Sequence, residues 1–231
     1  LWGTVEEHLR AEVEHQEDDR RLPAVLAERR LDSQTYFGRL AGAWDDVRTN
    51  LFGTAFTPSA LLGLIRPDWV VADLGCGTGN GSECLSPYVE RVIAVDSSLP
   101  MLEAARKRLV GCRNVEFRAG NLEALPLADG SVDAAVCVLV LHHLDDPAAA
   151  VREMSRVLRP ERGGVALVVD MVQHTREEYR VSMGHKHLGF SGERVAEMFG
   201  DAGLSKLRVM TLPCDPGGKG PGLFVAVGVK G

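Results

Sequence analysis

Short apolar runs alternate along the chain with segments whose apolar residues recur every three or four positions. The apolar runs occupy residues 70–73, 91–95, 115–118, 132–141 and 165–170. Runs of this kind, bounded by glycine and polar turns, predict strands, whereas the spacing at residues 100–109 and 147–158 predicts helices. Strands that alternate with helices predict an α/β fold, in which helices cover both faces of a parallel sheet.

The run at residues 132–141 carries apolar residues on both faces, which predicts a central parallel strand. Towards the C-terminus, Ser191 predicts the start of a helix that continues to Phe199. Two further runs, at residues 207–212 and 224–229, predict a terminal hairpin. The glycine- and proline-rich residues 213–222 would form the loop between them.

The first 33 residues differ from the rest. Trp2, Val5, Leu9 and Val13 recur at helical spacing with charged residues between them, which predicts an amphipathic helix. Its apolar stripe packs either on its own domain or on a partner, as a dimerising helix or a linker from an N-terminal domain. We favour the second interpretation, with a homodimer left open, and divide the chain into a helical extension at 1–33 and a main domain at 34–231.

Composition narrows the choice of partners and compartment. The formal net charge is −6 and no block of Lys and Arg stands out, so this chain alone is not expected to bind nucleic acid. No apolar run reaches the roughly 18 residues that span a bilayer, so no membrane partner is expected. The five cysteines lack paired spacing, which favours free thiols and a cytoplasmic location. The sequence begins with Leu1, so it could be a piece of a longer protein.

A glycine-rich turn follows the first strand. Gly75, Gly77 and Gly79 come directly after Asp73, and a helix is expected to follow them. A turn without side chains lets backbone N–H groups approach a nucleotide-like ligand closely. The dinucleotide pattern G-x-G-x-x-G does not fit, because Asn80 stands at its third glycine. A purely structural glycine turn is the alternative.

Asp96 ends the second strand, about one helix and a turn beyond the glycines. A carboxylate at this strand end can accept hydrogen bonds from both ribose hydroxyls. The alternative is an N-cap for the next helix. A dehydrogenase would use the same residue, so Asp96 favours a nucleoside without naming it.

Several segments, in the right order, resemble class I S-adenosylmethionine-dependent methyltransferases. Residues 73–79 resemble the family's first motif, D-x-G-x-G-x-G. Residues 120–126, G-N-L-E-A-L-P, are close to the G-D-x-x-x-L-P of ubiquinone-type C-methyltransferases. The other matching segments are the aromatic-rich residues 36–45, the L-H-H and D-P of residues 141–147, and residues 158–164, which are two residues longer than the family's pattern. The resemblance extends from about Tyr36 to Val229 and points to the type 11 methyltransferases.

The resemblance implies a doubly wound, mostly parallel seven-stranded Rossmann-like sheet with an antiparallel last strand. It also implies S-adenosylmethionine as cofactor and S-adenosylhomocysteine as product. The residues that it places against the cofactor are Tyr36, Trp44, Asp73, Gly75, Cys76, Gly77, Thr78, Gly79, Asp96, Ser97, Met101, Gly120, Asn121, Leu122, Val138, Leu139 and His143. Asn121 stands where the family has an acidic residue, so its contact with the adenine would be uncharged. For Tyr36 and Trp44, core packing is the alternative.

The resemblance further implies an enzyme that methylates a small molecule by in-line transfer, with residues 171–190 building the acceptor pocket. The candidates for removing an acceptor proton are His142, His143, Asp170, His174 and Tyr179. For the two adjacent histidines, orienting the loop is an equal alternative. No metal is predicted, because His174, His185 and His187 lack the spacing of zinc ligands.

Other functions were weighed against this one. An arsenite methyltransferase would need thiols, and residues 171–190 contain no cysteine. A quinone-ring C-methyltransferase fits the motifs, but no segment indicates an isoprenoid channel. The N-terminal segment before a methyltransferase loosely resembles arsenic-repressor-type regulators fused to such a domain. A non-catalytic sensor of S-adenosylmethionine or S-adenosylhomocysteine is therefore the alternative function, and a dehydrogenase is the weakest one. The sequence does not name the methyl acceptor.

Overall fold

A computed structural model of the chain describes residues 21–22, 25, 42–215 and 217–231. The chain divides into two compact units, Leu1–Ala60 and Leu61–Gly231, and each is described by itself. The predicted helix at the N-terminus, the domain boundary at residue 33 and the candidate Tyr36 fall outside the described residues. They remain predictions.

The described part of the first unit consists of two short helices. Helix α3 spans Trp44–Phe52, and α4, Phe56–Leu61, ends at the boundary between the units. The rings of Phe52 and Phe56 pack edge to face, with 5.9 Å between their centroids. The guanidinium of Arg48 lies 5.7 Å from the centroid of Phe56.

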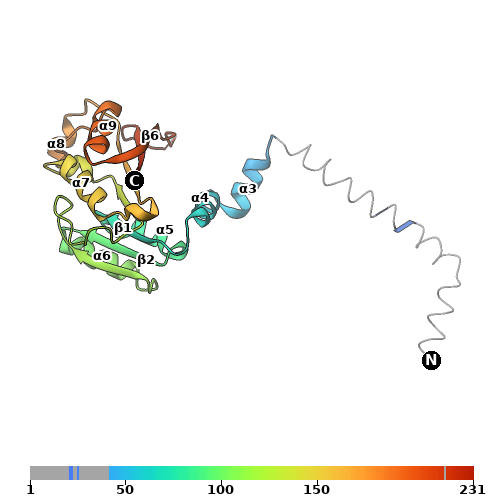
Figure 1. The fold of residues 1–231 in the computed structure, drawn as a ribbon. Coiled ribbons are helices and arrows are strands. Elements are labelled where there is room, and N and C mark those ends of the chain that lie inside the picture. The colour runs from blue at the N-terminus through green and yellow to red at the C-terminus, as the bar shows by residue number, and fades with distance from the viewer. Residues whose placement is uncertain (1–20, 23–24, 26–41, 216) are drawn as a thin grey trace. The chain divides into compact units, whose positions relative to one another are not determined.

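The second unit is built on a seven-stranded sheet (Figure 1). Its strands are β1 Val70–Leu74, β2 Arg91–Asp96, β3 Val115–Ala119, β4 Ala134–Val138, β5 Val165–Met171, β6 Leu204–Thr211 and β7 Leu223–Lys230. Its α-helices are α5 Asn80–Leu85, α6 Leu99–Arg108, α7 Pro147–Val157, α8 Glu178–Ser182 and α9 Gly192–Asp201. Single turns of 3-10 helix lie at Leu62–Leu64, Ser86–Tyr88, Leu141–His143 and Pro160–Arg162.

The strand order is β3-β2-β1-β4-β5-β7-β6, and β7 is antiparallel to both of its neighbours. The remaining pairs, from β3 to β5, are parallel, which confirms the predicted fold class. The order reverses between β1 and β4, where Val71 pairs with Val92 on one side and with Ala134 on the other. In open sheets of this type, ligands bind at the carboxyl ends of the strands beside this reversal.

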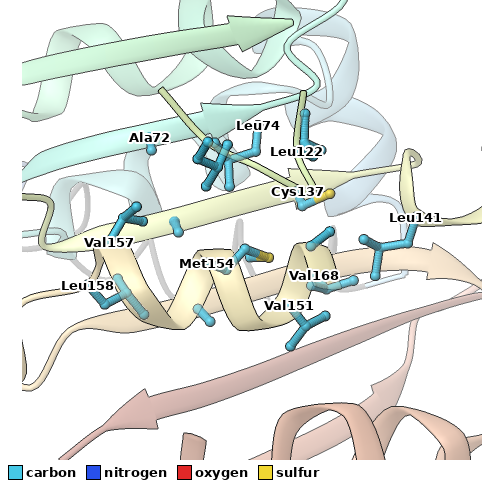
Figure 2. Packing of buried hydrophobic residues seen from close by; sticks show 14 of the residues in the cluster. Ala72, Leu74, Leu122, Cys137, Leu141, Val151, Met154, Val157, Leu158 and Val168 are labelled. Carbon is cyan, nitrogen blue, oxygen red and sulfur yellow. The ribbon is translucent and has the colours of Figure 1, made fainter. Parts of the chain in front are cut away.

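Apolar side chains on the two faces of the sheet form separate cores. One face packs against α7 and α9 around Leu74, Cys137 and Met154, which Figure 2 shows with their neighbours. The other face packs Val71 and Val92 into a smaller cluster. All five residues of β1 are buried because both faces of this central strand are covered.

Two of the predicted strands were wrong in extent. The strand predicted at 132–141 is only β4, Ala134–Val138, because Leu139 turns the chain at a φ of 58° and a 3-10 turn follows. Leu141 is still buried, so its apolar side chain fills the core from a turn, which the hydrophobic pattern cannot distinguish from a strand. Strand β6 begins at Leu204, before the predicted residue 207, and an irregular register between Ser205 and Arg208 interrupts it.

Among the described residues, no helix combines the length and apolar character that crossing a membrane requires.

Candidate functional site

The glycine-rich turn lies at the carboxyl end of β1 and folds over the end of β2. The backbone N–H groups of Gly75 and Cys76 both donate to the carbonyl of Val95, at 2.8 and 3.0 Å. Glycines 75, 77 and 79 all have positive φ, a conformation that favours glycine. The sequence therefore needs glycine at all three positions to place this turn beside Asp96.

The three glycines nevertheless face different surroundings. A Cβ atom on Gly75 would lie 2.5 Å from the side chain of Val140, and one on Gly79 would lie 2.8 Å from Leu109. A Cβ atom on Gly77 would meet no atom within 4 Å. Gly75 and Gly79 thus serve the packing of the turn, whereas Gly77 faces space in which a ligand can approach the backbone.

Asp96 lies directly under this turn. Its Oδ2 accepts a hydrogen bond from the Gly77 N–H at 2.8 Å, and its Oδ1 accepts one from the Ser98 N–H at the same distance. The alternative role as an N-cap belongs instead to Ser98, whose side chain accepts from the N–H of Met101. Each carboxylate oxygen of Asp96 keeps a further lone pair, so the group can still accept ribose hydroxyls.

Asp73 is a buried structural residue of the turn. Its Oδ2 accepts a hydrogen bond from Ser82 at 2.6 Å, and it is 4% exposed. Burial raises the pKa of the Asp73 carboxyl above its ordinary value, although the Ser82 hydroxyl opposes this shift. Cys76 and Leu122 are also buried, so these three residues could meet a cofactor only through their backbone atoms.

Most other predicted cofactor residues expose their side chains at the carboxyl ends of β1 to β4. The exposed residues are Thr78, Ser97, Met101, Asn121, Val138, Leu139 and His143. Asn121 Oδ1 accepts a hydrogen bond from the Glu123 N–H at 3.1 Å, which leaves a second lone pair free. Gly120 allows the chain to pass Pro126, because a Cβ atom there would lie 2.5 Å from its ring. Trp44 belongs to the other unit, so its cofactor role stays a prediction.

The end of β4 carries backbone strain. Leu139 has a φ of 58°, and its N–H donates to the carbonyl of Val169 at 2.8 Å. A non-glycine residue in this conformation costs about 1–3 kcal/mol and persists only where its surroundings require it. The turn exposes Val138 and Leu139 and directs the chain into the histidine pair.

His142 and Asp170 form a buried pair across the ends of β4 and β5. His142 Nδ1 lies 2.8 Å from Asp170 Oδ1, with exposed fractions of 4% and 0% for the two residues. Asp170 Oδ1 also accepts a hydrogen bond from the Met171 N–H, at 2.7 Å. With its proton on Nδ1 facing the carboxylate, the neutral imidazole keeps a lone pair on Nε2.

The segment after β5, residues 172–190, passes back alongside this pair and is called the returning segment. The N–H groups of Lys186 and His187 donate to the carbonyl of His142 at 2.9 and 3.0 Å. Gly189 permits the return, because its φ is 74° and a Cβ atom would lie 2.5 Å from the Val172 carbonyl. The return places the ring of His185 4.3 Å from that of His142, between centroids.

These rings border a pocket of about 580 Å³. Its wall is formed by three histidines, His142, His143 and His185, by residues of α8, and by the loop between β6 and β7. The lining residues include Leu139, His142, His143, Met171, Tyr179, Met183, His185, Leu212 and Cys214. Leu139 and His143 are also predicted cofactor residues, so the pocket begins where the expected cofactor site ends.

The remaining catalytic candidates differ in their access to this pocket. Tyr179 lines it, and the hydroxyl of Tyr179 accepts a hydrogen bond from Arg176 at 2.8 Å. His174 is not part of the lining, and its Nδ1 accepts from the Arg176 N–H at 3.2 Å. Burial lowers the pKa of His143, His174 and His185 below the ordinary histidine value. His143 Nδ1 lies 3.5 Å from the Gly184 carbonyl.

Sequence reasoning missed part of this wall. Met183 and His185 line the pocket from the predicted acceptor segment 171–190 but were not candidates for proton removal, and Cys214 lies outside that segment. The length and glycine content of residues 213–222 were the available signal, because long loops between strands often carry binding residues. Arg176 ties this loop to the returning segment by donating to the Lys219 carbonyl at 2.7 Å.

Comparisons with known proteins agree with this geometry. Residues 72–168 match the family model described as a methyltransferase domain. A methyltransferase of Bacillus subtilis, YcgJ, is 39% identical over 107 residues, which are 46% of this chain and 42% of that protein. A probable S-adenosylmethionine-dependent methyltransferase of Mycolicibacterium smegmatis is 35% identical over 153 residues, 59% of this chain and 58% of that protein. The crystal structure of YcgJ matches with a TM-score of 0.63 over 77% of this chain and 99% of that one, at 22% identity.

Residues 72–168 thus match a methyltransferase domain, and the relatives place this domain in the class I, S-adenosylmethionine-dependent type. The cofactor of such a domain is S-adenosylmethionine, and S-adenosylhomocysteine remains when the methyl group has left. The open space at Gly77, the carboxylate of Asp96 and the exposed end of β4 fit this cofactor. The chain spans only 42% and 58% of the two curated relatives. The resemblance to arsenic-repressor-type fusions remains a prediction.

The family model matches only residues 72–168, and the end of this match bears on which residues would select the acceptor. It covers the glycine turn, Asp96 and the histidine pair of the methyltransferase domain, and it ends at residue 168, before Asp170. The returning segment and the loop at residues 213–222 lie outside it. The features that would select an acceptor therefore come mainly from the part of the domain that the family model does not match.

Proposed function

We propose that the methyltransferase domain methylates a small, partly apolar molecule in the pocket beside Leu139, and that His142 accepts the proton this molecule loses. The buried pair of His142 and Asp170, of which His142 lines the pocket, carries this proposal. An aspartate that fixes Nδ1 of an imidazole leaves Nε2 as a proton acceptor of defined direction. The proposal selects this pair from the five candidates.

On the cofactor side, the residues of the glycine-rich turn would hold and orient S-adenosylmethionine. S-adenosylmethionine, when bound, supplies a methyl group activated by a positively charged sulfur. Gly77 would let the backbone lie against the cofactor, and Asp96 would accept its ribose hydroxyls. Val138 and Leu139, both about two-fifths exposed, would exclude water from the point where the two sites meet.

On the acceptor side, the pocket wall defines a chemical class. Leu139, Met171 and Leu212 offer apolar contacts, while the histidines gather at one end. This arrangement suits a molecule with an apolar body and one group that loses a proton, such as a phenol or an amine. Methyl transfer needs little beyond alignment of such a group with the methyl carbon, so positioning is the main task of the pocket.

The test begins with calorimetric titration of S-adenosylmethionine, S-adenosylhomocysteine and NAD. We expect the first two to bind with Kd near 1 µM, about −8 kcal/mol, and NAD not to bind. A panel of small phenols, amines and carboxylic acids is then screened for release of S-adenosylhomocysteine. His142→Gln should abolish this release while cofactor binding remains.

Two of the results that would contradict these expectations favour an alternative function. Cofactor binding without turnover on any compound would favour a sensor domain, and binding of NAD would favour a dehydrogenase. Turnover that survives His142→Gln would remove His142 as the proton acceptor and leave the methyltransferase assignment in place.

A further inference from the structure

Three imidazoles that line the proposed acceptor pocket lie against one another. His142 and His143 come from the turn after β4, and His185 comes from the returning segment more than 40 residues later. The centroid distances are 4.1 Å from His142 to His143, 4.3 Å from His142 to His185 and 5.0 Å from His143 to His185. One nitrogen of each ring lies within 4.8 Å of one nitrogen of each of the others.

We propose that His142, His143 and His185 form a binding site for one divalent transition-metal ion of the zinc type. Histidine nitrogens bind zinc at about 2.0–2.1 Å, which places the ligand nitrogens of a tetrahedral site about 3.4 Å apart. The ligand nitrogens, now within 4.8 Å of one another, would have to move closer to reach that value. His143 is the exposed member of the three, and the hydrogen-bond contact from its Nδ1 to the Gly184 carbonyl is long at 3.5 Å, so this ring would make most of the adjustment.

The hydrogen bonds around the cluster leave ligand atoms available. Asp170 engages Nδ1 of His142 and leaves Nε2 for a metal. Histidines that bind metals commonly donate their other N–H to a carboxylate, which orients the ring and raises its basicity. Asp170 would therefore act as the positioning residue of the site.

His185 gives a second, independent observation. The residue is 7% exposed, and its Nδ1 is buried without a hydrogen-bond partner. An unpaired buried nitrogen costs free energy, so such an atom calls for an explanation. A metal ion between the three rings would supply the missing partner.

Sequence spacing did not suggest this site. The histidines considered for a metal were His174, His185 and His187, and only His185 belongs to the group. His187 is committed elsewhere, because its Nε2 lies 3.1 Å from the Leu144 carbonyl. Three histidine ligands leave a fourth coordination position open, and all three histidines are also lining residues of the pocket.

The site has a consequence that rests on the proposed function. A metal on Nε2 of His142 occupies the lone pair that would accept the acceptor's proton. The ion and the proton therefore compete for one atom, and the metal-loaded protein is the form with the lower methyl-transfer rate. A cellular rise in such an ion would then lower the activity.

The binding test uses Co²⁺, whose visible absorption reports tetrahedral coordination, on the full chain without cofactor. We expect one equivalent to bind with micromolar affinity, and Zn²⁺ to displace it. His143→Ala and His185→Gln should each weaken binding more than about 100-fold, and Asp170→Asn by about 10–100-fold. His143 is exposed, so its replacement keeps the test valid if the His185 variant fails to fold.

His187→Gln is the matched control, because glutamine can still donate to the Leu144 carbonyl and the residue is not a proposed ligand. Its Co²⁺ affinity should equal that of the wild type. The proposed metal site is wrong if no Co²⁺ absorption appears, or if the Co²⁺ affinity is unchanged in both His143→Ala and His185→Gln. These readouts need no methyl acceptor, so their failure leaves the proposed function standing. Turnover that is unaffected by saturating Zn²⁺ would overturn the competition.

Discussion

Asp170 holds the imidazole of His142 at the junction of two neighbouring strands, with 2.8 Å between Oδ1 and Nδ1. The two residues are 28 positions apart, and pairing of β4 with β5 brings them together. The backbone strengthens the link, since the His142 N–H lies 3.4 Å from Asp170 Oδ2. A carboxylate with no exposed surface that faces one ring nitrogen fixes both the tautomer and the direction of the other nitrogen.

We predict that Asp170→Asn lowers the methyl-transfer rate at saturating substrate by about 10²–10⁴-fold. The amide cannot stabilise the protonated imidazole, although it keeps the size of the carboxyl group. Asp145→Asn removes the same charge near His142, from the loop between β4 and α7, at a side chain that is 81% exposed, and should leave the rate unchanged. Rates are measured as S-adenosylhomocysteine release, with cofactor affinity checked by calorimetry. Equal rates in the two variants would contradict the role of Asp170.

The grouping of the proposed cofactor residues was predictable because these residues are local in sequence. Asp73, the three glycines and Asp96 follow two strands whose apolar runs are unambiguous, and parallel pairing of β1 with β2 brings their ends together. The sequence could not predict that Gly75 and Gly79 serve the packing of the turn while Gly77 faces open space. This difference depends on Val140 and Leu109, which approach the turn only in the folded chain.

The acceptor half was predictable only as a set of residue types. His142 and Asp170 were both candidates, but nothing local indicates that they bond to each other. His185 was considered only together with His174 and His187, because spacing was the one available guide. Its place beside His142 depends on the hydrogen bonds from Lys186 and His187 and on the left-handed turn at Gly189.

We predict that Gly77→Ala weakens binding of S-adenosylmethionine while the protein remains folded. The added methyl group meets no protein atom, so the folded state bears mainly the strain of a positive φ, about 1 kcal/mol. Gly75→Ala should instead destabilise the fold, because its methyl group would lie 2.5 Å from Val140. Calorimetry gives the affinities, and urea denaturation gives the free energies of unfolding.

Gly200→Ala is the matched control for these variants. Gly200 lies in helix α9, and a Cβ atom there meets no atom within 4 Å. The change should raise the free energy of unfolding by up to about 1 kcal/mol through helix propensity and leave cofactor affinity unchanged. Wild-type affinity in Gly77→Ala would mean that the cofactor does not approach this backbone.

Asp133 is expected to be a major stabilising residue of the sheet. Its Oδ2 accepts hydrogen bonds from the Val70 N–H at 2.8 Å and from Arg159 at 2.7 Å. Arg162 Nη1 lies 2.9 Å from Oδ1 as an ion pair, without the angle of a hydrogen bond. Asp133 is 1% exposed, so its removal leaves the buried Val70 N–H and Arg159 without this partner, whereas Arg162 keeps its ion pair with Asp68.

We predict that Asp133→Ala lowers the free energy of unfolding by about 3–5 kcal/mol. Arg194→Ala, which breaks an exposed pair with Glu197, should lower it by less than about 1 kcal/mol. Both values come from urea denaturation followed by circular dichroism. A loss in Asp133→Ala no larger than that in Arg194→Ala would show that the Asp133 cluster does not contribute net stability.

Glu153 gives the fold a predictable dependence on pH. Its oxygens accept hydrogen bonds from Arg156 at 2.7 Å, and Oε2 also accepts from the Leu125 N–H at 2.7 Å. The hydrogen bonds from Arg156 hold the pKa of the Glu153 carboxyl below its ordinary value of 4.5, against an opposing effect of burial. The unfolded chain therefore takes up the proton first, and the stabilisation present above pH 4.5 is lost as the pH falls through the folded pKa.

We predict that Glu153→Gln lowers the free energy of unfolding at neutral pH by about 1.5–3 kcal/mol, the contribution of hydrogen bonds to a charged group. Denaturation at pH values from about 7 to about 3 should show this difference shrink below pH 4.5, as Glu153 in the wild type becomes protonated. Glu103→Gln, at an exposed position of helix α6, should follow the wild-type curve. A difference between Glu153→Gln and wild type that stays constant over this range would show that the glutamate stabilises through its shape and not through its charge.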